Sequence, residues 1–226
     1  MEFMELANER RSVRVYADKP VPRALIDEAI RAAQLAPSWK NSQTGRYYVA
    51  QSPESQAKIR ACLPSYNQKS SANAVLIVTA YEKGVSGFNG GEPTNELGDQ
   101  WGAYDLGLQN MLLTLRAREL GLDTLIMGIR DADAIRAAAA IPETEAVFAV
   151  IALGYRAQDP APAPGRRRRR SLRIFKICFA AAFSFGKKET RRKDGSLRKE
   201  RGSSFKAILF SRDGSLAASD RLIGAA

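Results

Sequence analysis

The stretch from Gln100 to Leu120 reads QWGAYDLGLQNMLLTLRAREL and is followed by Gly121. It predicts one long helix that ends at Gly121, because glycine commonly follows the last residues of a helix. The apolar side chains cover more than one stripe of this helix, so we expect it to be buried on several sides. It is either the central helix of a domain or part of a dimer interface, and the sequence favours neither. These side chains are Trp101, Leu106, Leu108, Met111, Leu112, Leu113 and Leu115.

Upstream of this helix the pattern alternates between helices and strands. Residues 22–33 carry apolar side chains at helical spacing, with proline near the start, and predict an amphipathic helix. Residues 46–50 and 74–80 predict strands, the second of them buried. Ser52 precedes proline and is expected to cap a helix that runs through residue 63.

Downstream of the helix the same mixture continues. Residues 124–127 predict a short strand, and Asp131 or Asp133 can cap a helix that reaches residue 140. Residues 147–153 form a second apolar strand. Helices and strands mix without a regular βαβ repeat, which indicates an α+β fold with helices packed on one mixed sheet.

A long loop separates the buried strand from the helix that starts at Gln100. Residues 84–98 contain SGFNGGEPTNELG, which has many turn formers and no periodicity. Long loops of this kind often cover a site, so this loop is a candidate lid.

The charge of the chain is divided unevenly. The formal net charge is +11, but residues 1–165 hold 17 basic and 19 acidic side chains, while residues 166–226 hold 18 and 5. The sequence DPAPAPG at 159–165 cannot continue a helix or a central strand. We therefore expect a compact domain over 1–165 and a basic C-terminal tail over 166–226.

The residue types that are missing narrow the chemistry. The chain has no histidine, which removes the commonest general base and metal ligand and makes hydrolytic mechanisms unattractive. Cys62 and Cys178 are far apart and suggest neither a disulfide nor a zinc site, so no metal is expected. Without an apolar leader or an apolar run long enough to span a membrane, a cytoplasmic location is expected.

A short basic segment near the N-terminus is a candidate anion site. Arg10-Arg11-Ser12-Val13-Arg14 alternates in a way that would put Arg10, Ser12 and Arg14 on one face if the segment is extended. The forked donors of arginine suit phosphate. Taken alone, the segment also fits a solvated charged stretch.

Four motifs in order resemble the nitroreductase family of flavoproteins. RRSVRVY at 10–16 is followed by PVP, a helix and APSWKNSQ at 36–43. GLDTLIMG at 121–128 then precedes a helix, Ile-Pro-Glu, and a strand that ends in ALGY. The likeness covers residues 3 to about 160. It implies a nitroreductase-like mixed sheet flanked by helices, in an intertwined homodimer with two sites at its interface.

The resemblance also implies which residues bind FMN. The residues expected at the phosphate and ribityl chain are Arg10, Arg11, Ser12 and Arg14. The residues expected to come from the partner subunit are Pro37, Ser38 and Asn41.

Further positions follow from the same resemblance. Asn67 would contact the edge of the flavin ring, and the backbone at Met127 and Gly128 would lie beside flavin N5. A basic residue after the last strand, Arg166 or Arg168, would reach the phosphate. Arg130 stands where the family often has an aromatic residue, which would alter the preference for electron acceptors.

The implied function is that of an enzyme. It would be an FMN-dependent NAD(P)H oxidoreductase that passes hydride through flavin N5 to small electron-poor acceptors, such as nitroaromatics or quinones, in a ping-pong cycle. Hydride transfer needs no protein acid or base, which is compatible with the absence of histidine. The alternative is a flavin-binding or inactive core whose basic tail binds nucleic acid or an anionic membrane.

The tail admits three interpretations: a nucleic-acid arm, a membrane-surface anchor and the product of a shifted reading frame. The last is favoured, because the family likeness breaks off abruptly and the basic residues show no helical periodicity. The apolar patch IFKICFAAAFSF at 174–185 is too short to span a bilayer. We therefore expect the tail to be disordered.

Overall fold

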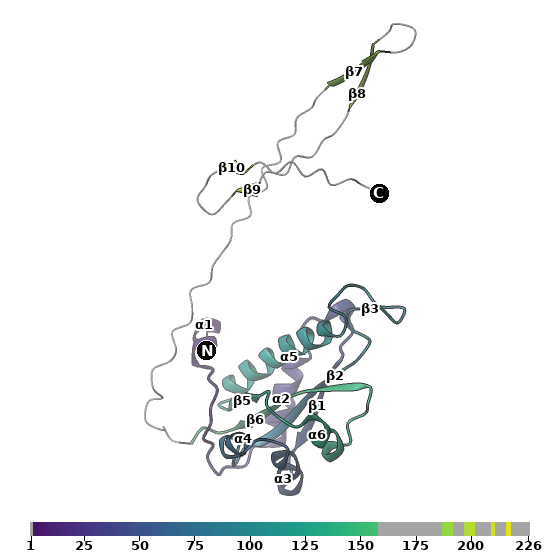
Figure 1. Cartoon of the computed structure of the whole chain (residues 1–226). Helices are drawn as coiled ribbons and strands as arrows, with labels where there is room; N and C mark the ends of the chain where they lie inside the picture. The colour runs from purple at the N-terminus through teal and green to yellow at the C-terminus, as the bar shows by residue number, and fades with distance from the viewer. Residues whose placement is uncertain (1, 158–186, 192–196, 202–208, 211–215, 218–226) are drawn as a thin grey trace. The chain divides into compact units, whose positions relative to one another are not determined.

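The computed structural model describes residues 2–157 and, in the tail, residues 187–191, 197–201, 209–210 and 216–217. The chain divides into two units, Met1–Arg166 and Arg167–Ala226, which are described separately. The first unit has a central sheet with helices on both faces (Figure 1).

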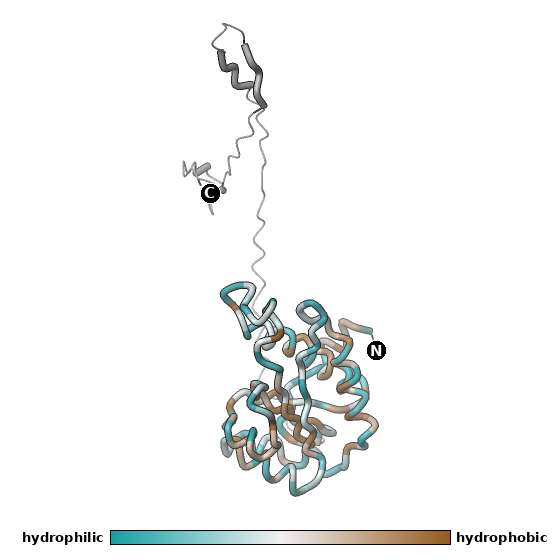
Figure 2. Tube along the Cα trace, turned by 90° about the vertical axis from the view of Figure 1, so that its right-hand side faces the viewer, coloured by the Kyte–Doolittle hydropathy of each residue, from teal (hydrophilic) through white to brown (hydrophobic). Residues whose placement is uncertain are grey.

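The sheet of the first unit has four strands in the order β1-β2-β6-β5. They are β1 (Gly45–Ala50), β2 (Val75–Glu82), β6 (Glu145–Gly154) and β5 (Asp123–Met127). All three pairings between them are antiparallel. Hydrophobic residues gather in the middle of this unit in Figure 2, and β2 and β6 are almost completely buried. The four predicted strands are confirmed. At most of their ends, the observed strand is one or two residues longer than the predicted one.

The parallel component of the sheet is an isolated bridge between Ser12 and Thr124 at the edge of β5. Val13 N–H donates to the carbonyl of Thr124 at 3.0 Å. The N-terminal segment therefore continues the sheet beyond β5, although it is not a full strand.

One face of the sheet is covered by α2 (Arg23–Ala33) and α5 (Gln100–Glu119), which pack on each other. Ile26 and Leu113 are fully buried between these helices and the sheet. The predicted helix 100–120 is confirmed, and Gly121 follows it with φ +80°. Glycine adopts this left-handed conformation without strain, which explains the end of the helix.

The other face is covered by α3 (Pro53–Ala61), α4 (Ser65–Ser70) and α6 (Ala132–Ala139). Both predicted caps form: the Ser52 side chain accepts from the N–H of Ser55, and Asp131 accepts from the N–H of Ala134 at 3.0 Å. Between Asp131 and Asp133, the structure thus selects Asp131. Helix α4 was not predicted, because six polar residues, SYNQKS, show no apolar periodicity.

The predicted loop at 84–98 contains a small hairpin of two-residue strands, β3 (Phe88–Asn89) and β4 (Glu92–Pro93). Two residues per strand are too few to show periodicity, which is why the pattern indicated only a loop. A remaining short helix, α1 (Phe3–Glu9), begins the described chain and contacts α5.

In the second unit, β7 (Lys187–Arg191) pairs antiparallel with β8 (Leu197–Arg201), and β9 (Leu209–Phe210) with β10 (Leu216–Ala217). The boundary expected at 165 and most of the expected disordered tail lie outside the described residues, so both stay predictions. Within the part that is described, no helix is long and apolar enough to cross a membrane, and no cluster of His, Cys, Asp or Glu could hold a metal ion.

The packing of α5 on the sheet gives a stability prediction. A Cβ atom at Gly102 would overlap the ring of Tyr81 on β2, whereas one at Gly107 would meet nothing within 4 Å. We expect Gly102→Ala to lower the free energy of unfolding by about 2 kcal/mol, because overpacking outweighs the ~1 kcal/mol that alanine gains over glycine in a helix. Gly107→Ala is the matched control: its Cβ atom meets nothing within its own chain, so any loss should stay well below that of Gly102→Ala. Urea denaturation measures both, and equal effects of the two changes would contradict the described contact.

Candidate functional site

The segment from Arg10 to Arg14 is fixed to the sheet by Val13. Val13 is buried in the core and bonded to Thr124, while Ser12 and Arg14 are exposed on the opposite side. Ser12 and Arg14 thus flank one buried residue, but Val15 is exposed as well, so burial does not alternate along the whole segment. Arg11 is also exposed and Arg10 is half-buried. The segment presents basic and hydroxyl groups to solvent beside the first residues of β5.

Tyr16 holds the far end of this segment. Its hydroxyl donates to the carbonyl of Val13 at 3.0 Å, and its ring is buried beside Gly154. Burial, with a further contribution from Asp123, raises the pKa of Tyr16 well above its ordinary value. The phenol therefore stays a neutral donor, and its hydrogen bond back to Val13 fixes the turn of the segment.

A buried charge cluster lies directly behind the segment. The Asp123 side chain is 1% exposed and accepts two hydrogen bonds from Arg156, at 3.1 and 2.9 Å. Arg118 on α5 approaches the same carboxylate at 3.3 Å and also pairs with Glu9 on α1 at 3.1 Å. One cluster thus joins α1, α5, β5 and the chain after β6. Sequence reasoning missed it, although a carboxylate opening the apolar strand TLIM was a visible signal.

The other end of β5 brings three more of the predicted residues together: Asn67, Met127 and Gly128. Asn67 on α4 is 8% exposed, and its side-chain amide donates to the carbonyl of Ile129 at 3.1 Å. This bond places Asn67 against the loop that follows Met127 and Gly128. The Met127 side chain is buried in the core, so only its backbone can face a ligand.

The surface around Gly128 is open and apolar. A Cβ atom there would meet nothing within 4 Å. Ile126 and Ile129, on either side in the sequence, are 49% and 67% exposed. From Thr124 to Gly128 an extended chain covers about 13 Å. The two ends of β5 therefore differ: the end at Thr124 is basic and polar, and the end at Gly128 is open and apolar.

Arg130 does not extend into this open surface. Its guanidinium donates to the carbonyl of Val147 on β6 at 2.6 Å. That carbonyl lies beyond the end of β5, whose pairing with β6 stops at Met127 and Val150. Arg130 therefore satisfies a strand carbonyl that β5 leaves unpaired.

Pro37, Ser38 and Asn41 lie around a short turn, η1 (Trp39–Asn41). The Ser38 hydroxyl accepts from the N–H of Gln43 at 3.0 Å, and the Asn41 side chain accepts from the Gln43 amide at 3.0 Å. Pro37 and Asn41 are exposed. The turn is a compact polar unit in which Gln43 bonds to both Ser38 and Asn41.

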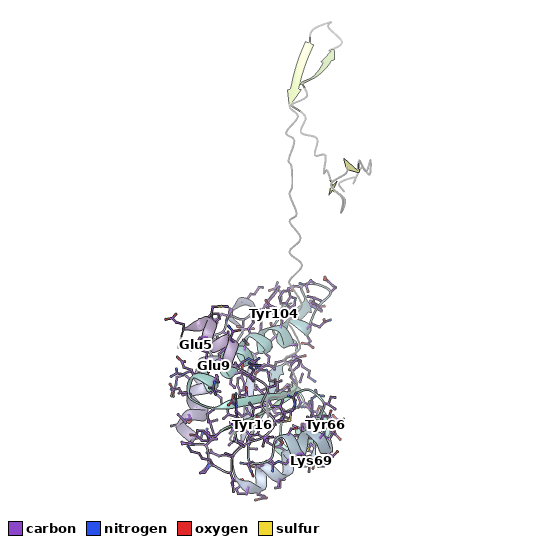
Figure 3. The ribbon with its side chains drawn as sticks, turned by 90° about the vertical axis from the view of Figure 1, so that its left-hand side faces the viewer. Glu5, Glu9, Tyr16, Tyr66, Lys69 and Tyr104 are labelled. Atoms are coloured by element: carbon purple, nitrogen blue, oxygen red, sulfur yellow. The ribbon has the colours of Figure 1, made fainter. Side chains whose placement is uncertain are left out.

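This turn and the basic segment are attached to different ends of α5. The N–H of Trp39 donates to Asp105, whereas α1 is joined to Arg118. Thirteen helical residues separate these two anchors, a distance of about 20 Å along the axis. In Figure 3, Tyr104 on α5, next to the anchor Asp105, lies well away from Tyr66 and Lys69 on α4, the helix that carries Asn67. Within one chain, the structure brings together two of the three predicted groups but not the turn.

A cavity of about 380 Å³ lies elsewhere, between α3, α6 and β1. Its lining includes Tyr48, Ser52 and Lys58 but none of the predicted site residues. The polar groups there are paired with each other, as in the Lys58–Glu54 ion pair at 2.7 Å. Nothing in this cavity calls for a ligand, and we place the candidate site along β5. Arg166 and Arg168 lie outside the described residues.

The charge cluster gives a second stability prediction. Asp123→Asn leaves Arg118 and Arg156 without their shared carboxylate. We expect a loss of about 3 kcal/mol in the free energy of unfolding, at the low end for a broken buried pair because both guanidinium groups retain contact with water. Asp27→Asn, which breaks the exposed pair with Arg23 on α2, should cost less than about 0.5 kcal/mol. Denaturant unfolding distinguishes the two; similar losses would refute the special role of Asp123.

Comparisons with known proteins agree with this arrangement. The profile of the Nitroreductase family matches residues 7–155. A protein of Archaeoglobus fulgidus, provisionally named an NADH dehydrogenase/NAD(P)H nitroreductase, is 30% identical over 158 residues, which are 68% of this chain and 85% of that protein.

Two solved structures are also similar. An oxidoreductase containing FMN is 25% identical and has a TM-score of 0.61, with 70% of this chain and 79% of the other covered. A nitroreductase family protein of Streptococcus pneumoniae TIGR4 is 23% identical and shares the fold with a TM-score of 0.65, over 78% of this chain and 100% of the other. The family match spans more than half of the sequence and confirms the resemblance and the fold expected from it. The chain is an oxidoreductase enzyme that belongs to the nitroreductase family.

Proposed function

We propose that this chain is an FMN-dependent oxidoreductase that takes hydride from NAD(P)H and delivers it to small electron-poor acceptors, such as nitroaromatics or quinones. The observation that carries the proposal is the arrangement along β5. The segment Arg10–Arg14 lies beside its first residues, and the open backbone at Gly128 follows its last. The solved relative that contains FMN supports the choice of cofactor.

The polar end of β5 fits a phosphate and a ribityl chain. Ser12 and Arg14 are exposed on the side opposite the buried Val13, and Arg10 and Arg11 are their neighbours. Arginine offers several N–H donors in a planar fork, which matches the oxygens of a phosphate. These four residues would bind the phosphate and ribityl chain, with their backbone fixed by Thr124 and Tyr16.

The apolar end fits a planar ring. Gly128 has no side chain to hold a ring away from the backbone, and the exposed Ile126 and Ile129 offer apolar contact beside it. Asn67 fixes this loop through Ile129 and would contact the ring edge. The ring of FMN would therefore lie against Met127 and Gly128, about 13 Å from Thr124.

When bound, FMN would supply a ring that accepts and returns hydride, so this step requires no side-chain acid or base. The lack of histidine is therefore compatible with the activity. The chain's own residues hold the phosphate, fix the loop at Gly128 and, through Ile126 and Ile129, exclude water from the ring face.

We also propose that the site is completed by a second copy of the chain in a homodimer. Pro37, Ser38 and Asn41 are anchored about 20 Å along α5 from Arg118, which is away from the end of the site where Arg14 would bind the phosphate. Tyr104 and Met111 are 59% and 45% exposed on α5. An exposed apolar helix face of this kind favours a partner surface. In this arrangement, the turn of one subunit would cover the cofactor of the other.

The first test is the visible absorption spectrum of the purified protein. We expect flavin absorption that bleaches when NADH or NADPH is added without oxygen and returns when p-nitrobenzoate is added. The rate with each nicotinamide identifies the donor. A protein that stays colourless after incubation with FMN would refute the cofactor. It would then favour the alternative, a domain that its basic tail brings to nucleic acid or an anionic membrane.

A second test asks whether two subunits share one site. Arg14→Ala should weaken FMN binding about 10-fold or more, because a charge-assisted hydrogen bond contributes about 1.5–3 kcal/mol. Asn41→Ala should also weaken it. When the two variants are mixed and their subunits exchange, one of the two sites in each mixed dimer has both residues intact. Tight FMN binding should then return at up to half of the sites in these mixed dimers.

The control for this experiment is Arg31→Ala, an exposed arginine on α2 that is not among the proposed site residues. It should leave FMN binding unchanged alone and in mixtures. If mixing the Arg14→Ala and Asn41→Ala proteins restores no tight sites despite subunit exchange, both residues belong to one chain's site or to none.

A further inference from the structure

Two segments that are far apart in the sequence meet at one buried carboxylate on α5. Asp105 is 2% exposed. Its Oδ2 accepts the N–H of Trp39 at 2.9 Å and the hydroxyl of Ser86 at 2.6 Å. Trp39 begins the η1 turn, and Ser86 belongs to the 84–98 loop. A single oxygen therefore connects the turn to the loop.

Aromatic packing supports the same junction. The rings of Trp39 and Trp101 lie with centroids 4.7 Å apart. The indole N–H of Trp101 donates to the side chain of Asn95 at 3.0 Å, and Gly87 approaches Trp101 so closely that a Cβ atom would lie 2.7 Å from its ring. These are the two tryptophans of the whole chain. Their fluorescence therefore reports on this junction alone.

A third contact joins the exposed sides of the two segments. The Lys40 ammonium donates to the side chain of Asn89 at 3.3 Å. Because both side chains are exposed, we expect this bond to contribute little stability by itself. It shows that the β3–β4 hairpin lies against the outer side of the turn.

The turn needs external support, because its backbone is unfavourable. Lys40, Asn41 and Gln43 have φ values of +47°, +56° and +50°. Each such residue costs roughly 1 kcal/mol or more when it is not glycine, and persists only where its surroundings impose it. Asp105 supplies a bond at the start of this turn, directly before the strained residues.

We propose that Asp105 is a positioning residue that holds the η1 turn and the 84–98 loop as one unit. Because the turn itself is assigned to the cofactor and the loop lies against the outer side of the turn, the loop would border the space left for the electron acceptor in the partner subunit's site. This inference rests on the proposed function, because it needs Ser38 and Asn41 to lie at a bound flavin. It makes the loop a determinant of acceptor specificity and Asp105 the residue that sets its position.

The experiment compares Ser86→Ala with Asp105→Asn in the flavin-containing protein. Ser86→Ala removes only the bond from the loop. We expect the KM for p-nitrobenzoate to rise about 10-fold, because one buried hydrogen bond to a charged group contributes about 1.5 kcal/mol. The rate of flavin reduction by the nicotinamide and the Kd for FMN should stay within about twofold. Asp105→Asn loosens the turn as well, so it should raise both the KM and the Kd for FMN.

Tryptophan emission gives a readout that does not depend on activity. Both variants should shift the emission to longer wavelength, because Trp39 and Trp101 gain contact with water. The matched control is Thr79→Val, which removes another buried hydrogen bond, the one from the Thr79 hydroxyl on β2 to the carbonyl of Ala149 at 3.2 Å. It should lower stability but leave the emission, the KM and the Kd for FMN unchanged.

The outcomes separate this inference from the function on which it rests. A wild-type protein without a flavin spectrum would overturn both. A flavin-containing protein in which Ser86→Ala leaves the KM for p-nitrobenzoate unchanged would overturn the role of the loop alone. An unchanged FMN affinity in Asp105→Asn would overturn the positioning of the turn.

Discussion

Helix α5 lies directly against the sheet, at a separation that glycine makes possible. Gly102 faces the ring of Tyr81, and Gly45 on β1 faces Gln109, with no room for a Cβ atom at either position. Close approach excludes water from a surface that also carries polar groups, such as the Tyr47 hydroxyl, which bonds to Gln109 and Asn110. The position of every residue on α5 relative to the strands is thereby fixed, and the two ends of the helix become reference points for the site.

A buried carboxylate forms contacts at each end of α5, and no local sequence pattern explains either set of contacts. At the C-terminal end, Arg118 meets Asp123, whose desolvation is offset by a second guanidinium from Arg156. At the N-terminal end, Asp105 receives the Trp39 N–H and the Ser86 hydroxyl. Burying a carboxylate is costly, and both are satisfied by donors from other segments. The first fixes the surroundings of the basic segment, and the second fixes the turn and the loop.

The length of α5 therefore decides how a site can be assembled. About 20 Å of rigid helix separates the anchor of the polar turn from the anchor of the basic segment, and in the proposed arrangement one chain does not close around a ligand held at β5. A second copy of the same chain supplies the missing turn in the proposed arrangement, and the exposed side chains of Tyr104 and Met111 offer it an apolar surface. Binding and assembly are coupled in such an enzyme, because each cofactor would need residues from two subunits.

The sequence by itself determined the features that depend on neighbours a few residues apart. The helix over 100–120 and its end at Gly121, and the caps at Ser52 and Asp131, all follow from local geometry. The order of four motifs determined the family. Family resemblance, not local pattern, supplied the expected roles of Asn67 and Gly128. The structure adds that they are neighbours, through Ile129.

Only the tertiary structure decided how distant segments meet. The place of β6 between β2 and β5, the burial of Asp123 between two arginines, and the junction at Asp105 each join residues separated by tens of positions. Helix α4 formed from a polar sequence because it packs beside the loop after β5, where Asn67 is buried. No periodic pattern encodes such contacts, because they arise when separately formed elements exclude water from one another and their buried polar groups must find partners.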